Sequence, residues 1–264
     1  MKCTVGGHSG GRDLIHALRI AYDGTRYAGW QRQENAPTVQ QALEEALERL
    51  LGEKVAVVGA GRTDAGVHAD GQVASFPLSR AFPASGLVHG TNHHLPAHVR
   101  IVAAAPAPER FHARRSAAAK VYRYRCLEAR RVAPERAPFV LAVAAGLDWE
   151  AIERATLALP GRHDFSAFAS AGGAPGPTER TLFAAGWRRE GDERVLRVVG
   201  EGFLRGMVRA LVGTLLEVGH GRRSVAEFAA LLRGGGRDAA GATAPPHGLA
   251  LERVDYPARD APLW

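Results

Sequence analysis

Apolar residues that alternate with polar ones predict a strand at residues 14–22, near the start of the chain. The dipeptide Asp23-Gly24 follows it and is typical of a tight turn, so residues 25–33 are expected to fold back beside this strand as a hairpin. The same kind of pattern predicts further short strands at residues 55–58, 67–76 and 101–105.

A helical pattern interrupts these strands at residues 39–51, where apolar side chains recur every three or four positions. Thr38 and Gln41 have the spacing of a capping box at the start of this segment. Gly52 follows the last apolar position and is a typical terminating residue. These signals predict a helix with both ends defined.

Prolines at residues 105–111 indicate a linker between two domains. We therefore expect an N-terminal α+β domain at residues 13–107 and a C-terminal α+β domain at residues 108–264. Residues 1–12 mix Gly, Ser and His without apolar periodicity, which predicts a flexible tail.

The second half again mixes strands and helices. Its first predicted strand is residues 116–127, where Tyr122 and Tyr124 share one face. Arg123 and Arg125 share the opposite face. The elements expected after it are helices at 149–159, 203–218 and 225–232, strands at 181–188, 195–199 and 248–254, and a flexible loop at 234–246. This order favours two sandwich-like α+β domains with mainly antiparallel sheets that meet at a basic cleft, rather than a doubly wound parallel sheet.

Composition supports a globular protein, since 46% of the 264 residues are hydrophobic and 23% are charged. Lys and Arg number 34 against 27 acidic residues, a net charge of +7, and only three are lysines. Because guanidinium groups bind phosphates through two oxygens and stack on bases, a nucleic acid is a candidate partner. A general compositional bias toward arginine is the alternative explanation.

The two cysteines, Cys3 and Cys126, are too few for a disulfide framework or a zinc knuckle. The longest apolar run, residues 139–147, is far shorter than the roughly 20 residues that span a bilayer. No apolar leader opens the sequence. We therefore expect a cytoplasmic protein with no membrane partner.

The glycine-rich segment at residues 59–72 is the most informative part of the chain. A strand followed by Gly-x-Gly also opens a dinucleotide-binding site, but Asp64 occupies the third glycine position and no helix is expected next. Glycines let the backbone approach a ligand and place Arg62 and Asp64 at a sharp turn. Alternatively, Asp64 only caps backbone N–H groups of that turn.

Seven segments decide between these interpretations because they occur in one characteristic order. They are residues 22–33, 38–47, 59–76, 111–125, 161–168, 207–221 and 244–257. Together they resemble the TruA family of tRNA pseudouridine synthases over roughly residues 14–257, and the sequence GRTDAGVHA is highly specific for that family.

The resemblance implies isomerisation of uridine to pseudouridine at positions 38, 39 and 40 of the tRNA anticodon stem-loop, by a homodimer without a cofactor. Asp64 matches the family's catalytic aspartate, Tyr122 its active-site tyrosine, and Arg209 the arginine that pairs with the aspartate. Arg62 matches an arginine that contacts RNA near the target base. Three intact site residues argue against the alternative function, a non-catalytic RNA-binding module.

The residue types fit this chemistry. Moving C1′ from N1 to C5 of uracil requires a carboxylate that acts as nucleophile or base, and attack on the sugar, addition to the base and removal of a sugar proton all stay open for Asp64. Arg209 lies in an apolar helix and needs a carboxylate partner if buried, although a snorkelling surface arginine is an equal alternative. Tyr122 could stack on an extruded uracil, but taken alone ordinary sheet packing explains it better.

Other positions bear on RNA contacts. The chain departs from the family pattern at Arg205 and Gly206, where aromatic or histidine residues are usual, which puts the family's RNA contacts there in question. A basic cluster is the best candidate for an RNA track, with a solvated sheet face as the alternative. It comprises His112, Arg114, Arg115, Arg123 and Arg125.

Four histidines in one segment raise the possibility of a metal site. They are His89, His93, His94 and His98. No ligand spacing typical of zinc accompanies them, and the irregular surroundings favour a solvated loop. We therefore expect no metal and no other cofactor.

Overall fold

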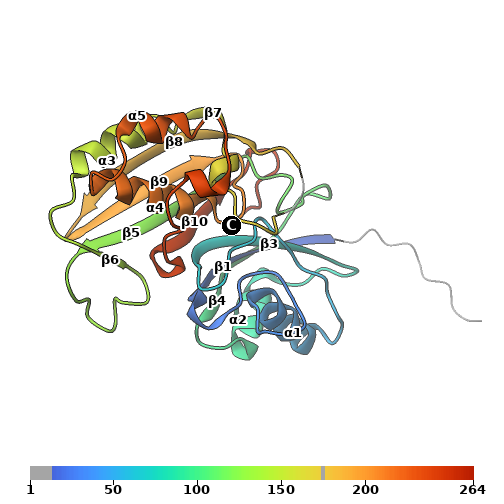
Figure 1. Ribbon diagram of the computed structural model, residues 1–264. Coiled ribbons are helices and arrows are strands. Elements are labelled where there is room, and N and C mark those ends of the chain that lie inside the picture. Colours follow the sequence, from blue (N-terminus) through green and yellow to red (C-terminus); the bar gives the residue numbers. More distant parts are fainter. Residues whose placement is uncertain (1–13, 174–175) are drawn as a thin grey trace, which may run out of the picture.

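The computed structural model describes residues 14–173 and 176–264, and the predicted tail at residues 1–12 lies outside them. The strands in these ranges are β1 (Leu14–Tyr22), β2 (Val58–Gly59), β3 (His68–Leu78), β4 (Val99–Pro106), β5 (Ala119–Glu128), β6 (Leu141–Val143), β7 (Gly161–Asp164), β8 (Glu179–Glu190), β9 (Glu193–Gly200) and β10 (Leu249–Asp255). The helices are α1 (Val39–Leu51), α2 (Ala84–His94), α3 (Trp149–Thr156), α4 (Met207–Gly219) and α5 (Val225–Ala230). Figure 1 shows their arrangement.

The strands form one sheet of order β4-β1-β3-β10-β5-β9-β8-β7, with β2 paired to β3 and β6 to β5. Two of these pairs are parallel, β10 with β3 and β6 with β5, and the others are antiparallel. The predicted α+β class with mainly antiparallel strands is thus confirmed. The halves do not have separate sheets, because β10 joins them: Leu251 lies between Ala69 of β3 and Tyr122 of β5. The division at residue 107 stays a prediction.

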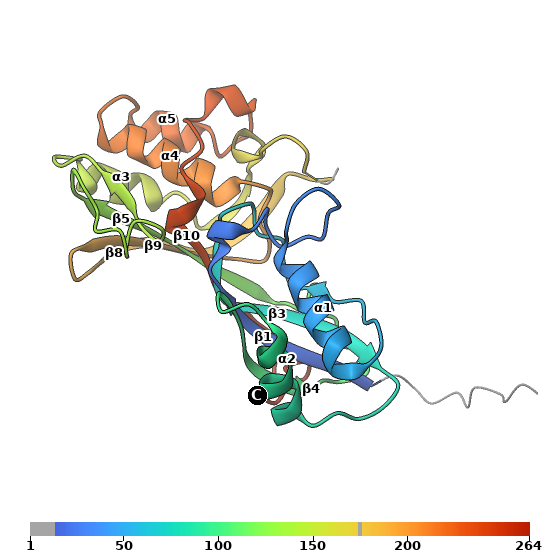
Figure 2. The same cartoon turned by 90° about the horizontal axis from the view of Figure 1, so that it is seen from below.

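One face of the sheet carries the main core. Side chains such as Leu18 of β1 and Tyr124 of β5 join Leu43 of α1 and Leu211 of α4 in a continuous buried cluster to which all five described helices contribute. Figure 2 shows the helices in two groups, α1 and α2 beside β1, β3 and β4, and α3 to α5 beside β5, β8 and β9. On the opposite face, Ala17, Val73 and neighbours form a smaller cluster around Phe111 and Ala113.

The start of α1 follows the sequence prediction. Thr38 accepts a hydrogen bond from the backbone N–H of Gln41 (3.3 Å), and Gly52 ends the helix with a φ of 75°. The Gln41 side chain donates to Glu45 and does not accept from the backbone N–H of Thr38, so only half of the expected capping box forms.

The prediction that residues 25–33 form a hairpin with β1 is wrong. The Asp23 carboxylate accepts from the backbone N–H of Thr25 (2.9 Å) and starts a 3-10 turn at Gly24–Arg26, so the next segment leaves the sheet. Strand β1 pairs instead with β3 and β4, which come later in the chain. Of the strand predicted at residues 55–58 only Val58 lies in a strand, β2, and the predicted linker at 105–111 begins inside β4.

The prediction of a solvated loop for the histidine-rich segment is also wrong, since His89, His93 and His94 belong to helix α2. Its buried side is small, mainly Leu87 and Thr91, so its sequence has little helical periodicity.

The start of α4 and the segment before β10 differ from the prediction. Helix α4 begins at Met207 rather than residue 203, because Gly206 adopts a left-handed φ of 70° immediately before it. The segment 234–246 is not a free loop: Ala240 and Ala244 are buried, and the Ala244 N–H donates to the Arg209 carbonyl (3.0 Å). Within the described ranges, no helix has the length and apolarity needed to cross a bilayer.

Candidate active site

The segment between β2 and β3 contains Asp64 and is supported from the first part of the chain. The indole ring of Trp30 packs directly against Gly59. A Cβ on Gly59 would lie only 2.5 Å from atoms of this ring, so no larger residue fits at this position. The backbone N–H of Trp30 donates to the Thr63 carbonyl (3.1 Å), and the backbone N–H of Gly66 donates to the Tyr27 carbonyl (3.2 Å). We call residues 59–67 the aspartate loop. Strand β3 rather than a helix follows it, unlike in a dinucleotide-binding site.

Buried polar side chains of β1 and β3 hold the aspartate loop in place through hydrogen bonds. The Tyr22 hydroxyl hydrogen-bonds to the Thr63 hydroxyl (2.9 Å), and the fully buried Gln72 donates to the Gly61 carbonyl (2.8 Å). Burial raises the pKa of Tyr22 to about 12, so its hydroxyl keeps its proton at neutral pH. Strands β1 and β3 therefore determine the path of this loop.

The structure brings Asp64 and Arg209 together. An Arg209 Nη1 lies 3.2 Å from Asp64 Oδ2, while Arg209 Nε donates to the Ala244 carbonyl (2.8 Å). The Asp64 side chain is 26% exposed and the Arg209 side chain 20%. One guanidinium thus joins α4, the aspartate loop and the segment before β10, and leaves the carboxylate accessible.

Tyr122 of β5 borders the same place. The side chain is buried and makes an edge-to-face contact with Phe203 (4.9 Å between ring centroids). Its hydroxyl lies close to Gly61 of the aspartate loop, since a Cβ added to that glycine would be 3.9 Å away. Burial raises the pKa of Tyr122, and the negative charge of Asp64 acts in the same direction. Its hydroxyl is therefore a neutral hydrogen-bonding group at neutral pH.

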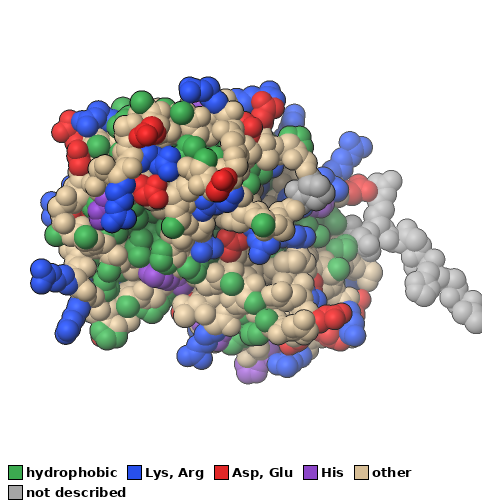
Figure 3. All heavy atoms as spheres, viewed as in Figure 1, with side chains coloured by type: hydrophobic (Ala, Val, Ile, Leu, Met, Phe, Trp, Pro, Cys, Tyr) green, Lys and Arg blue, Asp and Glu red, His purple; other side chains and the backbone are tan. Residues whose placement is uncertain are grey.

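Three of the predicted RNA-binding side chains are exposed near these elements. Arg62 projects from the aspartate loop and donates to Gln31 (3.1 Å). Arg114 and Arg115 project from a turn in which His112 Nδ1 accepts both of their backbone N–H groups (3.2 Å each). Burial, followed by the charge of Arg115, lowers the pKa of His112, which favours this neutral acceptor. Figure 3 shows Lys and Arg side chains over both halves of the molecule.

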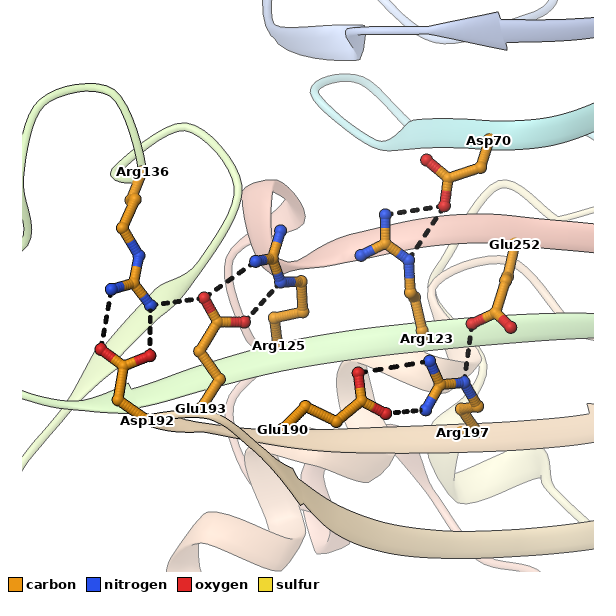
Figure 4. A pocket seen from close by; sticks show the side chains of 9 residues that line it. All are labelled: Asp70, Arg123, Arg125, Arg136, Glu190, Asp192, Glu193, Arg197 and Glu252. Atoms are coloured by element: carbon orange, nitrogen blue, oxygen red, sulfur yellow. Dashed lines mark hydrogen bonds and ion pairs between the residues drawn. The ribbon is translucent and has the colours of Figure 1, made fainter.

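The structure does not bring Arg123 and Arg125 to Asp64. They lie on the opposite face of β5 from Tyr122, as strand alternation predicts. Arg123 pairs with Asp70 (2.7 Å) and Arg125 with Glu193 (2.8 Å). Figure 4 shows both in a hollow lined by four arginines and five carboxylates, which largely neutralise one another.

Sequence analysis missed Lys120, which shares the face of Tyr122 on β5. It is only 9% exposed, and its Cε would lie 3.5 Å from a Cβ on Gly61. Burial lowers the pKa of Lys120, and the charge of Arg114 adds to this. The available signal was its position, since Lys120 lies in register with Tyr122 and Tyr124 on the otherwise apolar face of the strand.

In residues 14–173 and 176–264, no three histidine, cysteine or acidic side chains are grouped as a metal ion would require.

The sequence is similar to those of a known enzyme family. The sequence model of the tRNA pseudouridine synthase family matches residues 19–114 and 155–257. A tRNA pseudouridine synthase A from Myxococcus xanthus is 47% identical over 246 residues, covering 93% of this chain and 92% of the relative. One from Pelobacter propionicus is 46% identical over 239 residues, covering 90% and 98%.

A crystal structure of a Cbf5-Nop10-Gar1 complex is also similar, with 14% identity and a TM-score of 0.34 over 76% of this chain and 45% of that chain. This likeness is too weak to carry an argument. The sequence matches place the protein among the pseudouridine synthases, isomerases that convert uridine to pseudouridine in RNA. The chain belongs to the tRNA pseudouridine synthase family.

Proposed function

We propose that this enzyme isomerises uridine at positions 38, 39 and 40 of the tRNA anticodon stem-loop, with Asp64 as its catalytic carboxylate. The ion pair between Asp64 and Arg209 carries the proposal, because it joins an accessible carboxylate to a fixed cation at 3.2 Å. The three tRNA positions rest on the resemblance of the GRTDAGVHA segment to the TruA family.

The reaction needs no co-reactant because substrate and product are isomers. The C1′–N1 bond breaks, uracil turns, and a C5–C1′ bond forms while C5 loses a proton and N1 gains one. Asp64 acts as nucleophile or base in this sequence, and Arg209 orients its carboxylate. Tyr122 stacks on the extruded uracil, which must leave the stem to reach Asp64.

The RNA contacts follow the exposed cations. Arg62, Arg114 and Arg115 bind phosphates beside the aspartate loop, with His112 fixing the turn of the latter two. Arg123 and Arg125 contribute less because carboxylates already neutralise them. By the same resemblance, we propose a homodimer that acts in the cytoplasm on tRNA.

The decisive experiment replaces Asp64 by Asn, which keeps size and polarity but removes the nucleophilic, basic oxygen. Tritium release from tRNA labelled at uracil C5 should fall by several orders of magnitude. The affinity for tRNA should stay similar or increase, since a negative charge is lost. Asp70→Asn is the matched control and should retain activity, because Asp70 lies on the other face of the sheet and pairs with Arg123.

Near-normal tritium release by the Asp64→Asn protein would mean that Asp64 only caps a turn. Loss of binding together with activity would favour a structural role. The position assignment is tested with stem-loops that carry a single uridine at 38, 39 or 40, against stem-loops with the uridine elsewhere.

A further inference from the structure

Lys120 of β5 is a cation whose side chain is largely buried. Its side chain extends from β5 toward Gly61 of the aspartate loop and is nine-tenths buried. Among the residues that the structure describes, no carboxylate lies within ion-pair distance of it, and the nearby charged group is another cation, Arg114. Asp64, the acid of this loop, pairs with Arg209.

An ammonium group with little access to water is costly unless an anion compensates it. A neutral hydrogen-bond acceptor would not supply the missing negative charge. Two cations at one place, Lys120 and Arg114, therefore indicate a ligand with a full negative charge. In an enzyme that acts on RNA, the available anion is a phosphate.

We propose that Lys120 binds the RNA phosphate adjacent to the reacting uridine, with Arg114 as a second cation. This assignment rests on the proposed function, because it takes the site beside Asp64 as the place where the uridine reacts. The compact charge of lysine suits a single phosphate oxygen, whereas Arg62 and Arg115 suit phosphates farther along the strand.

The spacing along β5 agrees with this role. Lys120 and Tyr122 are two residues apart on one face, about 6.6 Å, which is comparable to the size of one nucleotide. Both side chains border Gly61: a Cβ on this glycine would lie 3.5 Å from Lys120 Cε and 3.9 Å from the Tyr122 hydroxyl, so the two side chains meet at the same residue of the aspartate loop. A uracil on Tyr122 thus brings its own phosphate toward Lys120.

The test measures binding in the Asp64→Asn background, so that no turnover occurs. The probes are anticodon stem-loops with one uridine at position 39 and a neutral methylphosphonate at its 5′ or its 3′ phosphate. For one of these two RNAs, the affinity of the Asp64→Asn protein should fall about tenfold. Adding Lys120→Met should cost a similar factor on unmodified RNA and nothing further on that methylphosphonate RNA.

Lys54→Met is the matched control, because Lys54 is an exposed lysine outside the site. It should leave the response to both methylphosphonates unchanged. Additive losses for Lys120→Met and both methylphosphonates would overturn the proposal. If Lys120→Met does not fold, the Asp64→Asn protein alone still tests the proposal. The proposal is then wrong if this protein binds both methylphosphonate RNAs as tightly as the unmodified RNA.

Two further outcomes separate related hypotheses. Thermal stabilisation by inorganic phosphate that depends on Lys120, without any methylphosphonate effect, would assign the site to free phosphate and overturn the RNA contact. Turnover by the Asp64→Asn protein would disprove the catalytic assignment but would not alter the binding cycle at Lys120.

Discussion

Arg209 connects three parts of the active site through one side chain. Its Nη1 contacts Asp64 and its Nε contacts the Ala244 carbonyl, so the planar guanidinium uses two donors in fixed relative directions. A lysine carries its donors on one nitrogen and lacks the two separated, coplanar donor nitrogens that reach Asp64 and Ala244. The position of the Asp64 carboxylate therefore depends on this arginine.

We expect Arg209→Lys to lower the single-turnover rate roughly 10- to 100-fold while the dissociation constant for tRNA changes only a few-fold, because positioning is lost but the charge remains. Rapid-quench assays with C5-tritiated tRNA measure the rate. Arg222→Lys, an exposed position beyond α4, is the control. A wild-type rate for Arg209→Lys would remove Arg209 from the mechanism.

Two buried histidines predict a dependence of stability on pH. Burial lowers the pKa of both His16 and His68 below the ordinary value of 6.5. Below about pH 6.5 the unfolded chain binds protons that the folded chain does not, so the free energy of unfolding falls until the folded-state pKa is passed. Each histidine contributes at most about 1.4 kcal/mol per pH unit.

Urea denaturation at pH 7.5 and pH 5.5 measures this effect. His16→Phe should show a smaller loss of stability on acidification than the wild type, because it cannot titrate and still stacks on Phe76. Equal losses for the two proteins would show that His16 does not contribute.

At the level of elements, close packing between α4 and the segment before β10 positions the site. A Cβ on Gly213 would lie 1.7 Å from the Ala242 carbonyl oxygen, and backbone at that distance must move. The same segment bonds to Arg209 through Ala244 and to the Tyr124 hydroxyl through the Pro245 carbonyl (2.8 Å).

Gly213→Ala should therefore lower the free energy of unfolding by about 1–3 kcal/mol and also reduce turnover, since Arg209 loses its support. Denaturant titration and tritium release measure the two effects. Gly186→Ala on β8 is the control, because a Cβ there meets nothing within 4 Å. If Gly213→Ala behaves like Gly186→Ala, the segment can shift without affecting the site.

Elements with local signals could be predicted, and those set by distant contacts could not. Helix α1 has its cap and its terminating glycine within its own sequence, and alternation on β5 correctly separates Tyr122 from Arg123. The hairpin prediction failed because Asp23-Gly24 is compatible with both a hairpin turn and a 3-10 cap. The contact between Asp64 and Arg209 joins residues 145 positions apart, a distance that no local pattern encodes.

For the whole molecule, a net charge of +7 and exposed arginines predict that tRNA binding weakens steeply as salt rises. Arg114→Ala and Arg115→Ala should each lower the slope of log affinity against log salt by about 0.7 to 0.9. Arg125→Ala should change it less because Arg125 is paired with Glu193. Filter binding at several salt concentrations gives the slopes, with Arg154→Ala on α3 as the control.

An affinity that does not change between low and physiological salt would contradict the electrostatic basis of tRNA binding. A larger effect of Arg125→Ala than of Arg114→Ala would move the RNA track to the opposite face of the sheet.

Strand β10 occupies the middle of the sheet, yet it is the last of the described strands to emerge from the ribosome. Until it is synthesised, residues 68–69 of β3 and 119–124 of β5 lack the partner strand that they have in the folded sheet and expose unpaired backbone groups. The segment that contacts Arg209 is made immediately before it. Nascent chains are therefore expected to be inactive toward tRNA and in need of protection from edge-to-edge association until translation of β10 closes the sheet.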